Sequence, residues 1–225
     1  MTTTISRLYN SHAEARSAVR DLEAAGVSHG DISIIASNAD NWYDAKNKTY
    51  PDRDLDGKDD RAEGAATGGG IGALAGGTAG LLAGLGIMAI PGVGPVVAAG
   101  WLVAALTGAA AGGATGGIIG ALSQQAGLSE EETEVYAEGL RRGGAIVSVR
   151  VAEADAARLQ ATMVRSAVRI ADRAAAYRKS GWSTYDPKAK PYTADEVMRS
   201  GPSIDESAWR AGRYRPAFFL SLRIQ

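Results

Sequence analysis

The sequence predicts an α+β fold in which a small mixed β-sheet with helices is interrupted by a long helical hairpin rich in glycine and alanine. Three observations lead to this class. Residues 1–37 and 129–179 carry ordinary strand and helix patterns. Residues 64–129 between them hold no charged side chain. From residue 180 onward, proline, glycine, serine and aromatic residues recur without a lasting helical period, which is typical of an extended arm.

Residues 1–37 predict a β-α-β unit, the first half of the α/β domain. Residues 5–9 are typical of a short strand. Ser11 stands three residues before Glu14, the capping-box spacing that begins a helix, and Gly26 ends that helix. Residues 31–35 supply a second strand rich in β-branched side chains. Because a helix connects the two strands, we expect them to be parallel.

Residues 129–179 predict an α-β-α unit, the second half of the same domain. Ser129 and Glu132 form another capping box, and residues 145–151 alternate like a half-buried strand. Apolar residues then recur at steps of three and four through residues 153–179, which predicts one amphipathic helix. We expect all strands to form one ferredoxin-like sheet with helices on one face and the uncharged hairpin as a long insertion.

The last segment, residues 180–225, predicts an extended arm that ends in a strand. Apolar side chains alternate at Phe218, Leu220, Leu222 and Ile224. Such a strand completes its own sheet or adds to a neighbour's, and the sequence leaves both open.

Glycine recurs at every fourth position through residues 64–128, on both sides of a Pro-Gly-Val-Gly-Pro break at residues 91–95. Residues four apart share one helix face, so these rows let a second helix backbone approach closely. We therefore expect helix packing and oligomerisation along the rows. The packing positions are Gly64, Gly68, Gly72, Gly76, Gly80, Gly84, Gly100, Gly108, Gly112, Gly116 and Gly120.

Two environments are compatible with this hairpin. A helix over residues 64–90 is about 40 Å long, enough to cross a bilayer core of about 30 Å. The segment holds few large apolar side chains, however, and acidic runs at residues 52–63 and 130–138 flank the hairpin and oppose anionic lipid. A membrane hairpin and a soluble filament, ring or shell both remain open, and burial within one chain is the least favoured arrangement.

The linker at residues 38–63 contains a candidate calcium loop. Residues 52–63 match the D-x-D-x-D-G-x5-E pattern, in which alternate carboxylates converge on one hard cation. Pro51 replaces the end of an entering helix, and Asp59 takes a position that is usually apolar. A solubilising acidic linker is the alternative. The predicted ligands are the side chains of Asp52, Asp54, Asp56, Asp60 and Glu63 and the carbonyl of Lys58.

Composition argues against catalysis and favours self-association. The chain has no cysteine, and neither His12 nor His29 has a nucleophile or metal-ligand partner at a useful spacing, so we expect no enzyme activity and no small-molecule substrate. Residues 1–140 hold 8 basic and 17 acidic side chains, whereas residues 141–225 hold 16 and 8. This asymmetry favours attraction between copies. Basic residues of the arm are scattered among acids, so we expect no nucleic-acid partner.

Four short segments carry a family resemblance: Ile-Ser-Arg-Leu-Tyr at residues 5–9, Leu-Glu-Ala-Ala-Gly-Val at 22–27, Asp-Ile-Ser-Ile at 31–34, and Tyr-Ala-Glu-Gly-Leu-Arg-Arg-Gly-Gly at 136–144. Here the chain resembles bacterial heat-induced or general-stress proteins with a YflT-like domain, in particular those with a glycine-zipper insertion. The resemblance covers roughly residues 3 to 151. It implies a small α/β stress-response domain and no catalytic residues.

From these observations we expect a non-enzymatic, stress-associated structural protein that assembles through its glycine rows. The N-terminus lacks a signal-peptide pattern. The expected location is therefore the bacterial inner membrane, with the α/β domain in the cytoplasm and lipid as a partner besides a second copy of the chain. The alternatives are a soluble cytoplasmic homo-oligomer and a calcium-responsive regulatory module.

The calcium hypothesis makes a direct prediction. Titration of calcium into the purified chain should release heat that is lost in the D54A/D56A double variant, because two of the converging carboxylates are gone. Isothermal calorimetry measures both. Absence of binding heat with the unmodified chain would remove the site.

Overall fold

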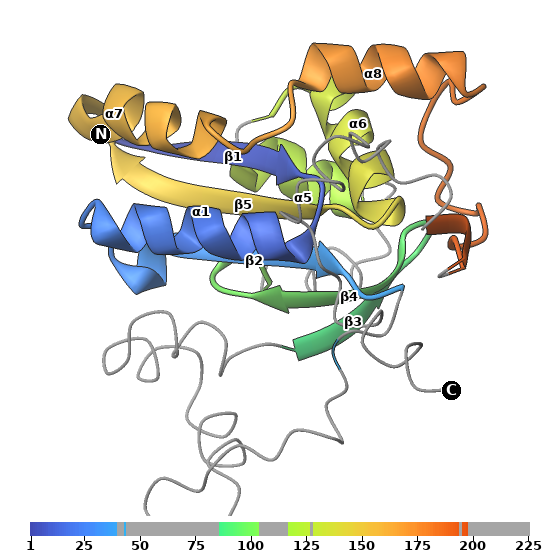
Figure 1. Cartoon of the computed structure of the whole chain (residues 1–225), viewed down its shortest axis with the longest axis horizontal. Helices are drawn as coiled ribbons and strands as arrows, with labels where there is room; N and C mark the ends of the chain where they lie inside the picture. The colour runs from blue at the N-terminus through green and yellow to red at the C-terminus, as the bar shows by residue number, and fades with distance from the viewer. Residues whose placement is uncertain (40–42, 44–85, 104–116, 127, 194, 198–225) are drawn as a thin grey trace, which may run out of the picture.

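A computed structural model describes residues 1–39, 43, 86–103, 117–126, 128–193 and 195–197 (Figure 1). The strands are β1 (Thr2–Tyr9), β2 (Ile32–Ser37), β3 (Gly86–Ile90), β4 (Gly94–Ala99) and β5 (Ala145–Ala152). The helices are α1 (His12–Ala24), the short 3-10 helix η1 (His29–Asp31), α5 (Gly117–Ala126), α6 (Glu130–Arg141), α7 (Glu153–Val164) and α8 (Ile170–Lys179). The α+β class is as predicted.

One five-stranded sheet organises these elements, in the order β1-β5-β2-β4-β3. β5 pairs antiparallel with β1 on one side and with β2 on the other, so β1 and β2 point the same way, as their connecting helix predicts. The prediction of a mixed sheet is wrong, however. β5 separates the two parallel strands, and all pairings among the described strands are antiparallel.

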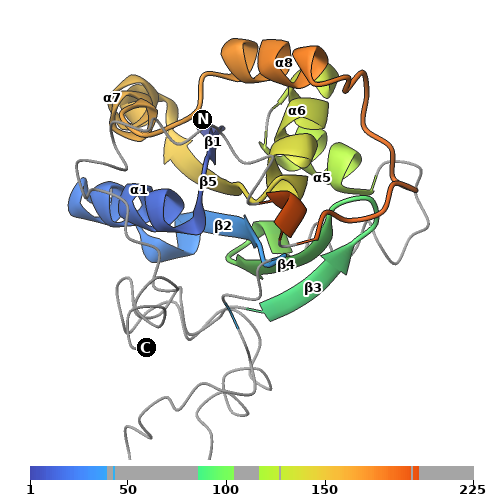
Figure 2. The ribbon, with the colours of Figure 1, turned by 45° about the vertical axis from the view of Figure 1, so that its right-hand side comes forward.

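Helices cover both faces of the sheet, whereas the sequence predicted one face (Figures 1 and 2). On the first face α1 and α7 contribute Leu22 and Met163 to a cluster with β-strand side chains. On the second face α5 and α6 bury Leu122 and Leu140 against Ile146 and its neighbours. β5 is an interior strand, flanked by β1 and β2, so its alternating side chains are buried on both faces, and it is not the half-buried strand that was predicted.

Residues 153–179 form two helices, α7 and α8, and the prediction of one long helix is wrong. α7 packs on the first face of the sheet, whereas α8 lies outside α6, where Ala174 and Tyr177 contact Val135. Residues 165–169 carry the chain from one layer to the other. Within this connection the Val168 amide donates to the Leu8 carbonyl at 2.7 Å. This bond caps part of the edge strand β1.

The helix starts that the capping spacing predicted are confirmed. Ser129 and Glu132 form a reciprocal capping box at α6. At α1 the Ser11 hydroxyl accepts from the Glu14 amide, while the Glu14 carboxylate accepts from the Asn10 amide at 3.0 Å. The two serine hydroxyls satisfy amide groups that the first helical turn leaves without partners.

The helical hairpin predicted for the uncharged stretch is wrong at residues 86–99. Residues 86–99 are a β-hairpin, in which β4 pairs with both β3 and β2. Pro91 and Pro95 disfavour a helix here, and the β-branched Val96 and Val97 suit a strand. Gly92 and Gly94, with φ of 74° and 107°, supply the left-handed conformations that the turn requires.

Gly100, predicted as a helix-packing position, instead follows β4 with φ of 93°. A Cβ at this position would lie 2.4 Å from the Ile32 carbonyl oxygen and 2.7 Å from Ser33 Cα. Gly100 therefore packs closely against strand β2 and not against a helix. Gly120 does lie in a helix, α5. The remaining glycine positions, the calcium-loop residues and the predicted strand at residues 218–224 lie outside the described residues.

A helical and a left-handed conformation at residue 100 predict opposite effects of the same substitution. Gly100→Ala should lower the free energy of unfolding by about 2 kcal/mol, because alanine disfavours the left-handed conformation and its Cβ meets backbone. Gly120→Ala is the matched control, since nothing lies within 4 Å of its Cβ site, and a gain of up to about 1 kcal/mol is expected there. Urea unfolding measures both. If Gly100→Ala instead raised the free energy of unfolding, residue 100 would be helical, as the sequence predicted.

Candidate functional site

Charged and aromatic side chains converge at the C-terminal end of α6. The Glu138 side chain is 1% exposed and accepts from Arg141 Nη1 at 3.2 Å and from Arg142 Nε at 2.6 Å. The spacing of three and four residues places both arginines on the side of the helix that carries Glu138. Two cations thus share one buried carboxylate, and the cluster keeps a net positive charge.

Both arginines also stack on tyrosine rings from later parts of the chain. The Arg142 guanidinium lies 4.5 Å from the ring centre of Tyr177 on α8, and that of Arg141 lies 4.2 Å from the ring centre of Tyr192. Burial raises the pKa of Tyr177 to about 12, although Arg173 and Arg142 oppose the shift. The ring therefore stays neutral at physiological pH and serves as a stacking surface.

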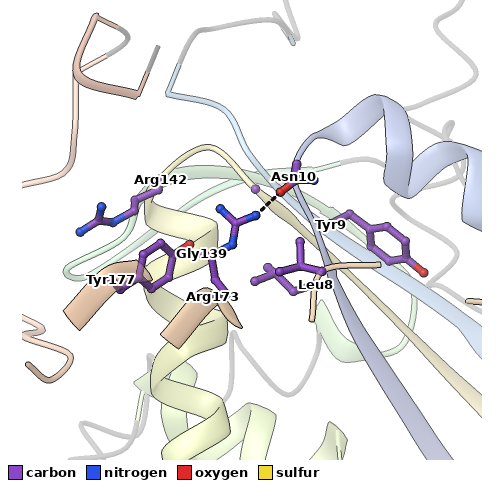
Figure 3. A pocket seen from close by; sticks show the side chains of 9 residues that line it. Leu8, Tyr9, Asn10, Gly139, Arg142, Arg173 and Tyr177 are labelled. Carbon is purple, nitrogen blue, oxygen red and sulfur yellow. Dashed lines mark hydrogen bonds between the residues drawn. The ribbon is translucent and has the colours of Figure 1, made fainter. Parts of the chain in front are cut away.

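A small cavity lies beside this cluster, where the ends of β1, α6 and α8 meet (Figure 3). Arg173 points toward Asn10 and donates to its Oδ1, while the Arg142 guanidinium points away from the cavity. Burial raises the pKa of Glu14 nearby, and the Asn10 amide and Arg173 oppose the shift. The cavity volume is about 10 Å³, which holds about one water molecule. This junction is a packed contact between elements and is too small for a metabolite.

The described part of the arm comprises residues 180–193 and 195–197, and it passes α6 on its way to the β3–β4 turn (Figures 1 and 2). The Trp182 ring meets Tyr177 edge-on at 5.9 Å. The Thr184 hydroxyl donates to the Glu134 carboxylate at 3.0 Å, and Arg141 Nη2 donates to the Lys190 carbonyl at 2.9 Å. The arm is therefore attached to its own chain at several successive points.

The β3–β4 turn is shaped to receive this arm. The Tyr185 hydroxyl donates to the Pro91 carbonyl. A Cβ on Gly92 would lie 2.6 Å from the Asp186 carbonyl oxygen, and one on Gly94 would lie 2.8 Å from Pro191 Cβ. The two glycines thus let the arm come closer than any other residue would permit.

A second polar group is buried in the sheet, where three serines stand side by side on β1, β5 and β2. Ser6 and Ser148 share a hydrogen bond of 2.8 Å between their hydroxyls. The Ser33 hydroxyl donates to the Ala99 carbonyl at 2.8 Å and accepts from the Leu102 amide at 3.3 Å. These hydroxyls join strands and the segment after β4, so their arrangement is structural.

None of the predicted calcium ligands lies in the part of the chain that the structure describes. Within that part, no group of three or more His, Cys, Asp or Glu side chains is placed to hold a metal ion. Across the same described ranges, no helix combines the length and hydropathy needed to span a bilayer. Of the predicted packing glycines, Gly100 and Gly120 are described, and they lie on different elements.

The site formed by the arm and the turn was not predicted from the sequence. Two signals for it were present: the Glu138, Arg141 and Arg142 spacing on one helix, and the glycines of the break at residues 91–95, interpreted there as a link between helices. Together the fold and these contacts define an α+β domain that holds an extended C-terminal arm. Comparison of the chain with protein-family models, curated proteins and solved structures found no match.

The buried carboxylate gives a testable consequence. Glu138→Ala should lower the free energy of unfolding by about 3 kcal/mol, because Arg141 and Arg142 lose the charge that compensates them. Glu131→Ala on the same helix is the control. Its ion pair with Arg178 is exposed, and its loss should cost about 1 kcal/mol or less. Equal effects in thermal or urea unfolding would contradict the role given to Glu138.

Proposed function

We propose that this chain is a non-enzymatic, stress-associated structural protein that assembles with copies of itself through its uncharged stretch. One observation carries the proposal: β3, the last strand in the order of the described sheet, is an edge strand without a charge or a proline. The stress association rests on the resemblance at residues 5–9, 22–27, 31–34 and 136–144. Self-assembly rests on the edge strand and the glycine rows.

The composition of β3 favours pairing with another strand. Edge strands usually carry charges, prolines or bulges that prevent such pairing. β3 has no charge or proline, and its Ile87 is 48% exposed. Antiparallel pairing with β3 of a second copy about Met88 would set Ile87 opposite Ala89 and Gly86 opposite Ile90. Each of these pairs matches a large side chain with a small one, so the strand is complementary to itself.

The β-hairpin also favours cooperation between the two glycine-rich segments. Gly86 and Ala98 are partners in the ladder, so the chain enters and leaves the hairpin at neighbouring points. The glycine row that precedes β3 in the sequence and the one that follows β4 therefore join the hairpin at neighbouring points of the sheet. Helix packing along such rows gains dispersion contacts in lipid and in a protein-only assembly alike.

A ferredoxin-like arrangement is the finer fold that we infer. β1, α1, β2, β5 and α7 support it, because β5 lies between two parallel strands and both helices cover one face. In this description the β3–β4 hairpin extends the sheet beside β2. We propose the inner membrane as the setting, with the folded domain in the cytoplasm, and a soluble cytoplasmic assembly as the alternative.

Placing a charge on the edge strand tests the proposal. Ile87→Lys should reduce the assembled fraction several-fold, because a lysine disfavours edge-to-edge pairing. Val164→Lys is the matched control. Val164 is the other exposed large side chain in a described helix or strand, 51% accessible on α7, and its change should leave assembly intact.

Sedimentation velocity of the full chain measures the assembled fraction of each variant. If both lysines have the same effect, or neither has any, the edge of β3 does not carry assembly. Unfolding curves accompany the measurement, and both exposed sites should tolerate lysine with little loss of stability.

A further inference from the structure

We propose that the surface which holds the arm also binds the arm of a second copy, so that copies exchange arms when they assemble. We call it the arm-docking surface, made of Pro91, Gly92, Gly94, Glu134 and Arg141. The inference rests on the proposed self-assembly, which brings two copies close together. It adds a second link between them, separate from the edge of β3.

The arm-docking surface recognises one particular extended segment. Gly92 and Gly94 leave room for the backbone at Asp186 and for the ring of Pro191, each of which would lie within 3 Å of a Cβ on the glycine that it meets. A proline-containing segment is already restricted in conformation, so its binding costs little chain entropy. The fit is set by shape, and every copy of the chain carries both halves of it.

Polar contacts fix the register of the arm on this surface. Tyr185 donates to the Pro91 carbonyl, and Thr184 donates to Glu134. Arg141 Nη2 donates to the Lys190 carbonyl, and the Arg141 guanidinium stacks on the Tyr192 ring. These contacts run from α6 to the turn, and an arm from a neighbour can make all of them.

The arm can leave without opening the core of the sheet. Its described residues contribute no side chain to the cluster under α1 and α7. Only Tyr185 packs, partly buried, against the cluster on the other face, and Trp182 packs, also partly buried, against the small cluster between α6 and α8. Gly181, with φ of 87° and nothing within 4 Å of its Cβ site, provides an uncrowded pivot after α8. Release therefore breaks a few surface contacts that exchange restores in full.

The arm and the start of α6 carry opposite charges, which attract the arm of a second copy as well as the chain's own. The arm carries the exposed Lys188 and Lys190, whereas α6 begins with the exposed Glu130, Glu131 and Glu132. In a monomer the arm reaches its own surface first. In an assembly the neighbouring surface is present at an effective concentration in the millimolar range, and exchange of identical elements then costs little.

Cysteine cross-linking tests arm exchange, because the chain has no cysteine of its own. A Cβ on Gly143 would lie 3.8 Å from Val197 Cβ, which is the mean separation across a disulfide. We propose to mix the full-length Gly143→Cys and Val197→Cys variants under oxidising conditions. Arm exchange predicts a covalent dimer on a non-reducing gel.

A mixture of Gly143→Cys with Val164→Cys measures linking by random collision, since Val164 is exposed on α7, which packs on the face of the sheet opposite to α6 and Tyr185 of the arm. Exchange predicts several-fold more dimer with Val197→Cys than with this control. If the double variant G143C/V197C closes within one chain while the mixture gives no more dimer than the control, exchange is wrong. If sedimentation still shows assembly, the proposed function stands without arm exchange. If neither assembly nor exchange is observed, the proposed function and the exchange proposal are both wrong.

Gly143 has φ of 92°, so a cysteine there strains the backbone and the variant could misfold. A second pair of cysteine positions keeps the test valid in that case. Thr184→Cys and Glu134→Cys replace exposed partners of one hydrogen bond. A short bis-maleimide should link these variants in trans if arms exchange. Cross-links found only within a chain that carries both cysteines would overturn the proposal.

Discussion

The pairing of β5 between β1 and β2 is the constraint on which the rest of this structure depends. Ile5 pairs with Val149 and Ile32 pairs with the same residue from the other side, so segments more than a hundred residues apart form one ladder. Because β5 is an interior strand with apolar side chains on both faces, both faces need cover, and α7 and α6 provide it on opposite sides. The uncharged stretch enters the domain only as an addition to this ladder, through β4.

Local signals predict the parts of the fold that local interactions determine. Capping at Ser11 and Ser129 and a strand at residues 145–151 are confirmed. The single helix over residues 153–179 is wrong because its apolar period continues across the break, and only the contact of Val168 with β1 reveals the change of layer. The helical prediction for residues 86–99 is wrong because fourfold glycine spacing outweighed the turn chemistry of residues 91–95.

The candidate site was less predictable than the fold. Glu138, Arg141 and Arg142 stand close together in the sequence, but Tyr177 and Tyr192, on which the arginines stack, lie far along the chain in α8 and in the arm. A charge pattern on one helix cannot show which distant ring it will meet. The physical outcome is that buried charge at the end of α6 holds α8 and the arm in place, and the glycines of the β3–β4 turn make room for that arm.

We propose that this protein works as an assembly of identical chains. The most direct test is the molar mass of the unmodified full-length chain, measured by light scattering over a range of concentrations with and without detergent. Self-assembly predicts masses that are multiples of the 23.2 kDa chain and that rise with concentration. A mass of 23.2 kDa under every condition would contradict it.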